Sequence, residues 1–323
     1  MRVTWRISLT CFLLLGVALP ATAQTYPTRP LRVIVPQPPG GGFDMVARTL
    51  SEPLASLLGQ PVIVENRPGG GTVVGTELAA KADADGYTLL LGASANLVLS
   101  AGLYRRLPYD PRTDFVPVGI AATFSYTLVA RNDLPFASLQ EIISHARLNP
   151  GKLTYASGGN GSGQHICAAL VWHGAGVALT HVPYKGAQLA YQDLIPGRVD
   201  LFFDASSTAR AHVEAGRVKP IAVSAPMRLK YHPGVPTVRE TGVLDFEMET
   251  WVGYFVRVGT PAPVLARLRS EFERVAATPE VAAMLEKRGA RPVRISAADA
   301  EALLARDIEK WAQLIRAAGI SAD

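Results

Sequence analysis

The chain has 323 residues, of which 48% are hydrophobic, and 32 basic against 27 acidic residues give it a formal net charge of +5 at pH 7. A chain of this length exceeds what one hydrophobic core usually organises, so we expect two lobes. No run of lysine and arginine interleaved with aromatic residues occurs in the sequence. The absence of such a run argues against a nucleic-acid partner.

The N-terminal segment, residues 1–23, has the pattern of a cleavable secretory signal. Two arginines lie in its first six residues, an apolar run covers residues 7–19, and Ala21-Thr-Ala23 provides an A-x-A cleavage site. The apolar run is shorter than the roughly 20 residues that cross a bilayer, so we expect cleavage before Gln24 and no retained anchor. Cleavage leaves Cys167 as the single cysteine, so the exported chain is expected to fold without an internal disulfide.

Short apolar runs alternate with helical patterns along the rest of the chain. Their lengths and their content of β-branched residues or leucine are typical of strands. The runs cover residues 31–35, 61–64, 87–92, 153–156, 179–182, 199–203 and 220–224. Strands separated by helices predict an α/β fold with parallel strands.

Capping residues and prolines mark the expected helices. Asp44 precedes a helix over residues 45–58, and Pro53 predicts a kink or a break within it. Two threonine-proline pairs and a serine cap predict three further helices, over residues 261–276, 279–288 and 296–318.

The two expected lobes divide the chain unequally. We place the first lobe at residues 24–124 plus 226–323 and the second at residues 125–225. The chain then crosses between the lobes twice, through extended segments at residues 118–130 and 219–225. A connection of two segments permits hinge bending around a ligand held between the lobes.

A glycine-rich loop over residues 157–165 is the most informative segment. It joins an apolar run to a stripe of helical spacing that begins at Ile166, so its N–H groups lie at the positive end of a helix dipole, where an anion is favoured. The loop lacks the Gly-Lys-Ser/Thr ending of a P-loop, and Gly163 comes one place too early for the dinucleotide pattern. A small anion, most simply a carboxylate, is therefore predicted. The candidate residues are Ser157, Gly159, Asn160, Gly161, Ser162 and His165.

A second glycine loop follows the first predicted strand and opens the first predicted helix. By the same reasoning it offers N–H donors to an anion, this time from the other lobe. Two facing helix N-termini suit a ligand with two acidic groups. The alternative is that the glycines only form a tight turn and the aspartate only caps the helix. The candidate residues are Pro39, Gly40, Gly41, Gly42, Phe43 and Asp44.

Seven stretches of the chain carry a family resemblance, and His181-Val-Pro-Tyr-Lys-Gly186 is the most specific of them. The others cover residues 35–48, 64–69, 85–90, 107–111, 157–165 and 236–240. From about residue 28 to its end, the chain resembles the solute-binding receptors of tripartite tricarboxylate transporters, also called the Bug family.

The resemblance implies a fold and a function. The implied fold is α/β, of the two-lobed periplasmic-binding-protein type (type II-like), with a central β-sheet flanked by helices in each lobe and a two-segment hinge. The implied function is a periplasmic receptor that captures a di- or tricarboxylate, an amino acid or an aromatic acid and delivers it to membrane permease subunits. We expect no cofactor and a monomeric protein.

The resemblance also implies where the ligand binds. The family uses the loops that match residues 38–44 and 157–165, and it makes further contacts at Ser94-Ala95-Asn96, Tyr184 and Asp204. Phe43 departs from the family pattern, in which a small polar residue is common, and this leaves the class of ligand open.

Three of these side chains have a structural alternative. Tyr184 either donates its hydroxyl into the cleft or packs half-buried at a strand end. Asp204 either pairs with an ammonium group of an amino-acid ligand or caps a helix over residues 208–215. His165 either donates to a carboxylate or bonds to neighbouring backbone.

Two further functions remain as alternatives. One is a hydrolase, with Ser157 or Ser162 as nucleophile and His165 or His181 as base. Neither serine lies in a Gly-x-Ser-x-Gly sequence, which disfavours this alternative. The other is a liganded receptor that signals to a sensor kinase. The spacing of histidines and cysteines fits no zinc motif, so we expect no metal site.

Overall fold

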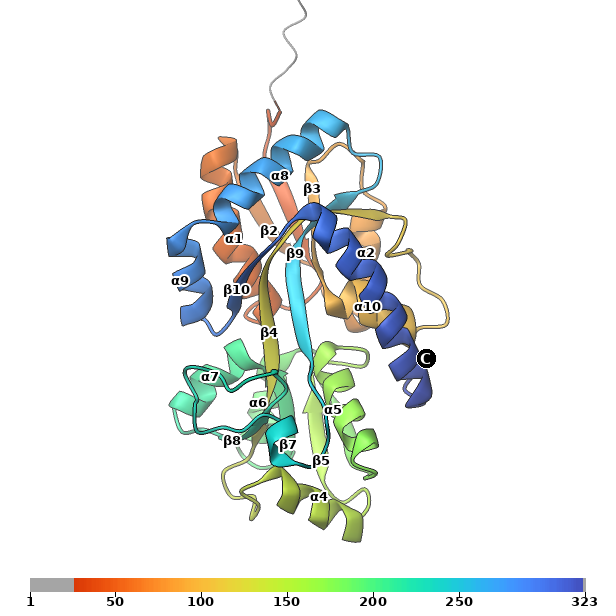
Figure 1. Cartoon of the computed structure of the whole chain (residues 1–323), viewed down its shortest axis with the longest axis vertical. Helices are drawn as coiled ribbons and strands as arrows, with labels where there is room; N and C mark the ends of the chain where they lie inside the picture. The colour runs from red at the N-terminus through yellow and green to blue at the C-terminus, as the bar shows by residue number, and fades with distance from the viewer. Residues whose placement is uncertain (1–25, 322–323) are drawn as a thin grey trace, which may run out of the picture.

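The computed structural model describes residues 26–321, which form two lobes with strands inside and helices outside (Figure 1). One path of paired strands runs through both lobes in the order β2-β1-β3-β9-β4-β7-β5-β6, and β8 and β10 pair with β4 beside this path. The α/β two-lobed fold agrees with the prediction. The predicted signal, residues 1–23, lies outside the described residues.

The first lobe is built from both ends of the described chain. Before the crossing it contains β1 (Leu31–Val35), α1 (Gly42–Leu58), β2 (Val62–Asn66), the 3-10 helix η1 (Gly70–Thr72), α2 (Val73–Ala80), β3 (Thr88–Ala93), the π-helix η2 (Ser94–Leu99) and α3 (Ser100–Leu103). After the crossing it contains β9 (Glu249–Arg257), α8 (Ala262–Ala276), α9 (Pro279–Lys287), β10 (Arg291–Ile295) and α10 (Ala297–Ala317).

The second lobe is formed by the middle of the chain and is entered through β4 (Phe115–Ala130). It contains α4 (Leu139–Leu148), β5 (Thr154–Ser157), α5 (Gly163–Gly174), β6 (Thr180–Pro183), α6 (Ala187–Leu194), β7 (Leu201–Ala205), α7 (Ser206–Glu214), β8 (Lys219–Val223) and the 3-10 helix η3 (Arg239–Thr241).

The strand pairing is mixed rather than wholly parallel. The pairs β1 with β2 and β3, and β5 with β6 and β7, are parallel, as expected for strands joined by helices. The strand β9 is antiparallel to β3 and β4, and β4 is antiparallel to β7, β8 and β10. The prediction of parallel strands is therefore wrong for the strands that join the lobes.

Two strands connect the lobes, and only one crossing lies where the sequence placed it. In β4, residues 115–125 pair with β9 and residues 126–130 pair with β7 and β8, so this strand runs through the segment where the first crossing was expected. The expected crossing at residues 219–225 is wrong, because β8 pairs with the second-lobe end of β4. The chain returns in β9, where Glu249 is opposite Ser125.

Residues between β8 and β9 stay with the second lobe instead of belonging to the first. The N–H of Val238 donates to the carbonyl of Val223 at 2.8 Å, and the Met248 N–H donates to the carbonyl of Ser224 at 2.8 Å. An extended apolar run looks the same in a strand and in a linker, and only its pairing partner distinguishes them. We therefore propose the lobe boundary near residue 248 rather than at residue 225.

The first helix, α1, begins earlier than the sequence predicted. The first helix begins at Gly42 with Gly41 as its N-cap, so Asp44 lies inside the first turn and is not the cap. The helix continues through Pro53 and ends at Gly59, whose φ of 70° forms a left-handed C-cap. The predicted break at Pro53 does not occur.

The main hydrophobic core extends through both lobes, and a second cluster around Phe202 lies within the second lobe. Large aromatic side chains on β7 and β9, including Phe202, Phe203, Tyr254 and Phe255, are fully buried.

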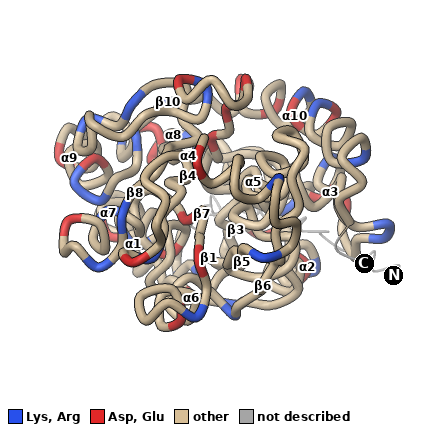
Figure 2. Tube along the Cα trace, turned by 90° about the horizontal axis from the view of Figure 1, so that it is seen from below, with Lys and Arg blue, Asp and Glu red and all other residues tan. Residues whose placement is uncertain are grey.

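Within residues 26–321, no helix combines the length and the apolar composition that spanning a bilayer requires. Acidic and basic residues are interspersed over both lobes (Figure 2).

Candidate functional site

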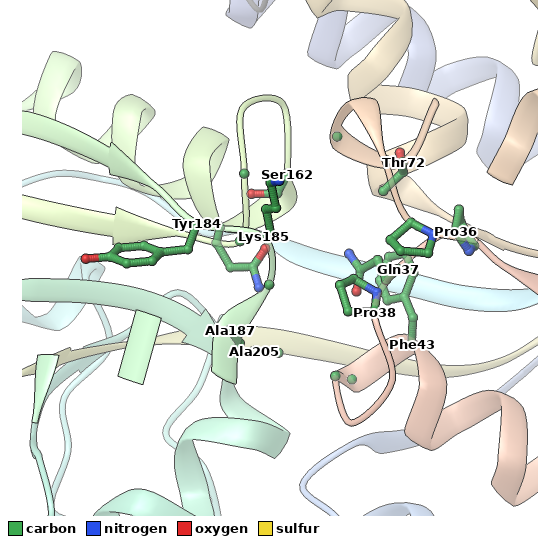
Figure 3. A pocket seen from close by; sticks show the side chains of 18 of the residues that line it. Pro36, Gln37, Pro38, Phe43, Thr72, Ser162, Tyr184, Lys185, Ala187 and Ala205 are labelled. Atoms are coloured by element: carbon green, nitrogen blue, oxygen red, sulfur yellow. The ribbon is translucent and has the colours of Figure 1, made fainter. Parts of the chain in front are cut away.

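A cleft of about 840 Å³ lies between the two lobes, where Figure 3 shows side chains facing each other from both sides. The first lobe lines it with residues 36–39, 41–43, 68–72 and 104, and β4 adds Phe124 and Tyr126. The second lobe lines it with residues 158–160, 162, 164, 183–188, 204, 205 and 208. Both predicted glycine loops thus border one shared cavity.

The cleft carries little charge. Among the described residues that line it, Lys185 and Asp204 are the charged side chains, and no arginine is present. Lys185 is exposed, whereas Asp204 is fully buried. Any anion in the cleft must therefore be held chiefly by neutral hydrogen-bond donors.

The first-lobe loop presents the N-terminus of α1 to the cleft. Gly42 and Phe43, the first residues of this helix, have N–H groups that no carbonyl within a helix can accept. Asp44 stabilises the loop from behind: its carboxylate accepts from the Gly40 N–H, Arg48 Nε and Asn66 Nδ2, each at 3.0 Å. Burial opposes ionisation of Asp44, but these hydrogen bonds prevail and lower its pKa.

The second-lobe loop presents the N-terminus of α5, and its own side chains occupy several of its N–H groups. The Gly159 N–H donates to Ser157 Oγ at 3.1 Å, and the Gly161 N–H donates to His165 Nδ1 at 3.3 Å. The N-cap Ser162 accepts from the His165 N–H at 3.3 Å. The donors left at this helix start are the N–H groups of Gly163 and Gln164.

Two stacked histidines support this loop from outside the cleft. The rings of His165 and His181 lie 4.1 Å apart at an interplanar angle of 9°, and His181 Nε2 is 2.7 Å from Ser157 Oγ. His165 therefore bonds backbone, which is the alternative to a ligand-binding role. Ser157 is completely buried and does not line the cleft, and the His165 ring bonds Gly161 rather than Ser162. The serine-histidine pairs expected for a hydrolase are not presented to the cleft.

The histidine pair makes a testable contribution to stability against acid. Burial lowers the pKa of His165 to about 4, and burial together with the charge of His165 lowers that of His181 to about 4. Because both pKa values are below that of an unfolded histidine, protons bind the unfolded chain first, and stability falls as the pH drops from 6.5 towards 4.

We expect the decrease in melting temperature between pH 7 and pH 5 to be smaller in His181→Gln than in the wild type. His173→Gln, which changes an exposed histidine on α5, serves as the control and should keep the full decrease. Equal decreases in all three proteins would show that the stacked pair does not control the response to acid.

Tyr184 and the 94–96 turn do not present polar groups to the cleft. The Tyr184 hydroxyl donates to Asp193 Oδ2 at 2.9 Å, and the ring points away from the cavity (Figure 3). Asn96 accepts from the Ala93 N–H at 2.8 Å, and Ser94 Oγ accepts from the Trp251 N–H at 3.1 Å. The turn thus joins β3 to β9, behind the cleft, and the predicted Tyr184 hydroxyl contact is wrong.

Asp204 lies at the C-terminal end of β7 and lines the cleft. The helix after it, α7, begins at Ser206 with Ala205 as its N-cap, so the expected helix-capping role of Asp204 is wrong. Its Oδ1 accepts from the Ala205 N–H at 2.8 Å and from Gln164 Nε2 at 3.3 Å.

One wall of the cleft was not predicted from the sequence. It is the segment over residues 68–72, where Thr72 is 3% exposed and has a φ of 101°, the only positive φ outside glycine among the described residues. A positive φ is strained for a β-branched residue, and such strain often occurs at functional sites. The available signal was the run of three glycines that precedes Thr72.

The two lobes touch at both sides of the cleft. A Cβ placed on Gly71 would lie 2.2 Å from the carbonyl oxygen of Asn160, across the lobe boundary. A Cβ on Gly186 would lie 3.0 Å from Cγ of Pro38 on the opposite lobe. The structure therefore shows the lobes in a closed arrangement, with glycines at the contact points.

The cleft brings together about half of the predicted site residues. Those that line it are Pro39, Gly41, Gly42, Phe43, Gly159, Asn160, Ser162, Tyr184 and Asp204. Those that do not line it are Gly40, Asp44, Ser94, Ala95, Asn96, Ser157, Gly161 and His165. In the second group, the side chains of Asp44, Ser157 and His165 bond the loop backbone instead.

Two α/β lobes joined by two strands, with helix N-termini facing a shared cleft, define a solute-binding protein of the periplasmic type. The chain belongs to the tripartite tricarboxylate transporter family of receptors, whose TctC model matches residues 46–320.

Individual relatives agree with this membership. A UPF0065 protein from Pseudomonas sp. (strain P51) is 38% identical over 311 residues, which are 94% of this chain and 92% of the relative. An adipate-bound protein of R. palustris has a TM-score of 0.87 at 32% identity, covering 92% of this chain and 99% of that chain. MatC of Rhodopseudomonas palustris with bound malate has a TM-score of 0.85 at 31% identity, covering 90% of this chain and all 100% of that chain.

Proposed function

We propose that this receptor binds a small dicarboxylate between its lobes, in the periplasm, and delivers it to the membrane permease subunits of a tripartite transporter. The observation that carries the proposal is that the N-termini of α1 and α5 border one cleft, and that no arginine is among the described residues that line it. The adipate and malate in the two similar structures support a ligand with two acidic groups. The secretory pattern of residues 1–23 supports export.

Neutral backbone amides are well suited to binding a dicarboxylate. Each helix start offers N–H donors that are already oriented and lie at the positive end of the helix dipole, an effect typically worth about 0.3–1 kcal/mol per charge. Hydrogen bonds to an ionised carboxylate add to this. The ligand thereby avoids the desolvation of a buried ion pair. The rings of Phe43 and Phe124, 5.9 Å apart, border the space between the two loops and suit the methylene groups of the ligand.

Titration calorimetry on the chain without residues 1–23 tests the proposal. We expect one molecule of adipate or malate to bind per chain with a Kd near or below about 1 μM. Hexanoate is a matched control for adipate, since it keeps the chain length and lacks one carboxylate, and we expect it to bind at least tenfold more weakly. No product should form during prolonged incubation followed by NMR.

Two results would contradict the proposal. Steady conversion of the acid would assign an enzyme instead of a receptor. Equal affinities for adipate and hexanoate would show that only one helix start binds a carboxylate.

A further inference from the structure

Asp204 is a buried acid in a cleft built for anions. It lies at the C-terminal end of β7, opposite Thr127 of β4, and its exposed fraction is 0%. It borders the same cavity as the N-terminus of α5, because Gln164 of that helix donates to its Oδ1. A ligand carboxylate held at this helix start therefore lies near a second acidic group.

One carboxylate oxygen of Asp204 lacks a partner. Oδ2 is buried and accepts no hydrogen bond from any described residue. The Tyr191 hydroxyl lies near enough to lower the pKa of Asp204 but makes no hydrogen bond of normal geometry with it. Within residues 26–321, no lysine, arginine or histidine acts on the pKa of Asp204. Burying an ionised carboxylate without a cation is costly, so the neutral form is favoured.

The groups packed around this end of β7 supply no positive charge. These groups are three tyrosines, one cysteine and one histidine. Burial raises the pKa of the tyrosines and of the cysteine and lowers that of the histidine, so each stays neutral near pH 7. Burial likewise raises the pKa of Asp204 itself to about 7. The groups are Tyr126 from β4, Tyr155 from β5, Cys167 from α5, Tyr191 from α6, and His212 from α7, which stacks on Tyr191 at 3.7 Å.

We propose that Asp204 takes up one proton from solvent when a carboxylate ligand enters the cleft. The inference rests on the proposed function. A ligand carboxylate and an ionised Asp204 would repel each other, since the exposed Lys185 is the one cation among the described residues that line the cleft. Protonation at Oδ2 removes that repulsion and lets the oxygen donate a hydrogen bond. Asp204 is thus a specificity-determining residue that couples anion binding to pH.

The direction of the pH dependence follows from this coupling. A bound anion raises the pKa of Asp204 further, so binding consumes a proton wherever the free receptor is ionised and the complex is not. Affinity for a dicarboxylate is therefore highest below pH 7 and falls by up to about tenfold per pH unit above it.

Calorimetry with adipate and malate tests the proposal directly. At pH 7.5, titrations in two buffers of different ionisation enthalpy should show net uptake of up to one proton per ligand bound. Over pH 6 to 8.5, the affinity of the wild type should fall at least tenfold. Asp204→Asn, which keeps the shape but not the ionisable group, should flatten this profile and bind at least tenfold more tightly than the wild type at pH 8.5. Glu214→Gln removes an acid from α7 outside the cleft and should keep the wild-type profile.

The outcomes separate this inference from the proposed function. Binding with no proton uptake and a flat wild-type profile overturns the role of Asp204 and leaves the receptor function standing. Proton release, or affinity that rises with pH, also overturns it, because ionisation of Asp204 would then favour ligand binding instead of opposing it. Absence of binding at every pH overturns both. The two-buffer measurement on the wild type decides the question even if Asp204→Asn does not fold.

Discussion

Replacing Gly71 by alanine should lower dicarboxylate affinity by at least about 100-fold, equivalent to about 2.7 kcal/mol. Gly71 is where the first lobe meets the second, and an added Cβ would lie 2.2 Å from the carbonyl oxygen of Asn160. The obstacle is backbone, so no side-chain rotation relieves it. The lobes must then stop short of the closed arrangement, and the amides of the two helix starts cannot engage one ligand together.

The matched control for Gly71→Ala is Gly59→Ala. Gly71 has a φ of 62° and Gly59 has a φ of 70°, so both substitutions impose similar backbone strain within the first lobe. Nothing lies within 4 Å of a Cβ on Gly59. We expect calorimetry to show wild-type affinity for Gly59→Ala. In small-angle scattering, Gly59→Ala should become more compact when the ligand binds, whereas Gly71→Ala should not. Tight binding by Gly71→Ala would disprove the role of this contact in closure.

Replacing Gly253 by alanine should destabilise the fold by about 3 kcal/mol or more. Gly253 is on β9, between Gly92 of β3 and Ile120 of β4, and its added Cβ would lie 2.1 Å from the carbonyl oxygen of Gly119. The clash lies within the two strands that join the lobes. Neither strand can move away without breaking its pairing.

Gly234→Ala provides the control for Gly253→Ala, since nothing lies within 4 Å of a Cβ on Gly234. In urea unfolding followed by circular dichroism, we expect the midpoint of Gly234→Ala to match the wild type and that of Gly253→Ala to fall clearly below it. Coincident midpoints for the two variants would show that the strands tolerate the extra methyl group.

The sequence predicts the individual elements better than their arrangement. All seven predicted strands form, because short runs of β-branched residues and leucine bounded by turns carry a local signal. Three of the ten strands in the described part of the chain were not among the predicted seven: β4, which was expected only as an extended crossing segment, β9 and β10. The β10 strand carries two arginines and a proline, and the apolar run of β9 was not assigned to a strand. Their antiparallel pairing with β4 depends on contacts between residues far apart in sequence, which no local pattern encodes.

In the candidate site, too, the individual loops were predictable from the sequence, and the contacts between them were not. Glycines and the turn between strand and helix correctly located both loops, because positive φ values and helix starts have local signatures. Which N–H groups remain free was not predictable, since it depends on side chains such as Ser157 and His165 that accept from the loop itself. The direction of Tyr184 likewise depends on Asp193, nine residues further along the chain.

A crystal structure of the receptor with bound adipate tests the central claim most directly. We predict one carboxylate within hydrogen-bond distance of the N–H groups of Gly42 or Phe43, and the other at those of Gly163 or Gln164, with Gly71 against Asn160. Adipate held by Lys185 at the rim, or bound with one helix start empty, would contradict capture by two facing sets of backbone amides.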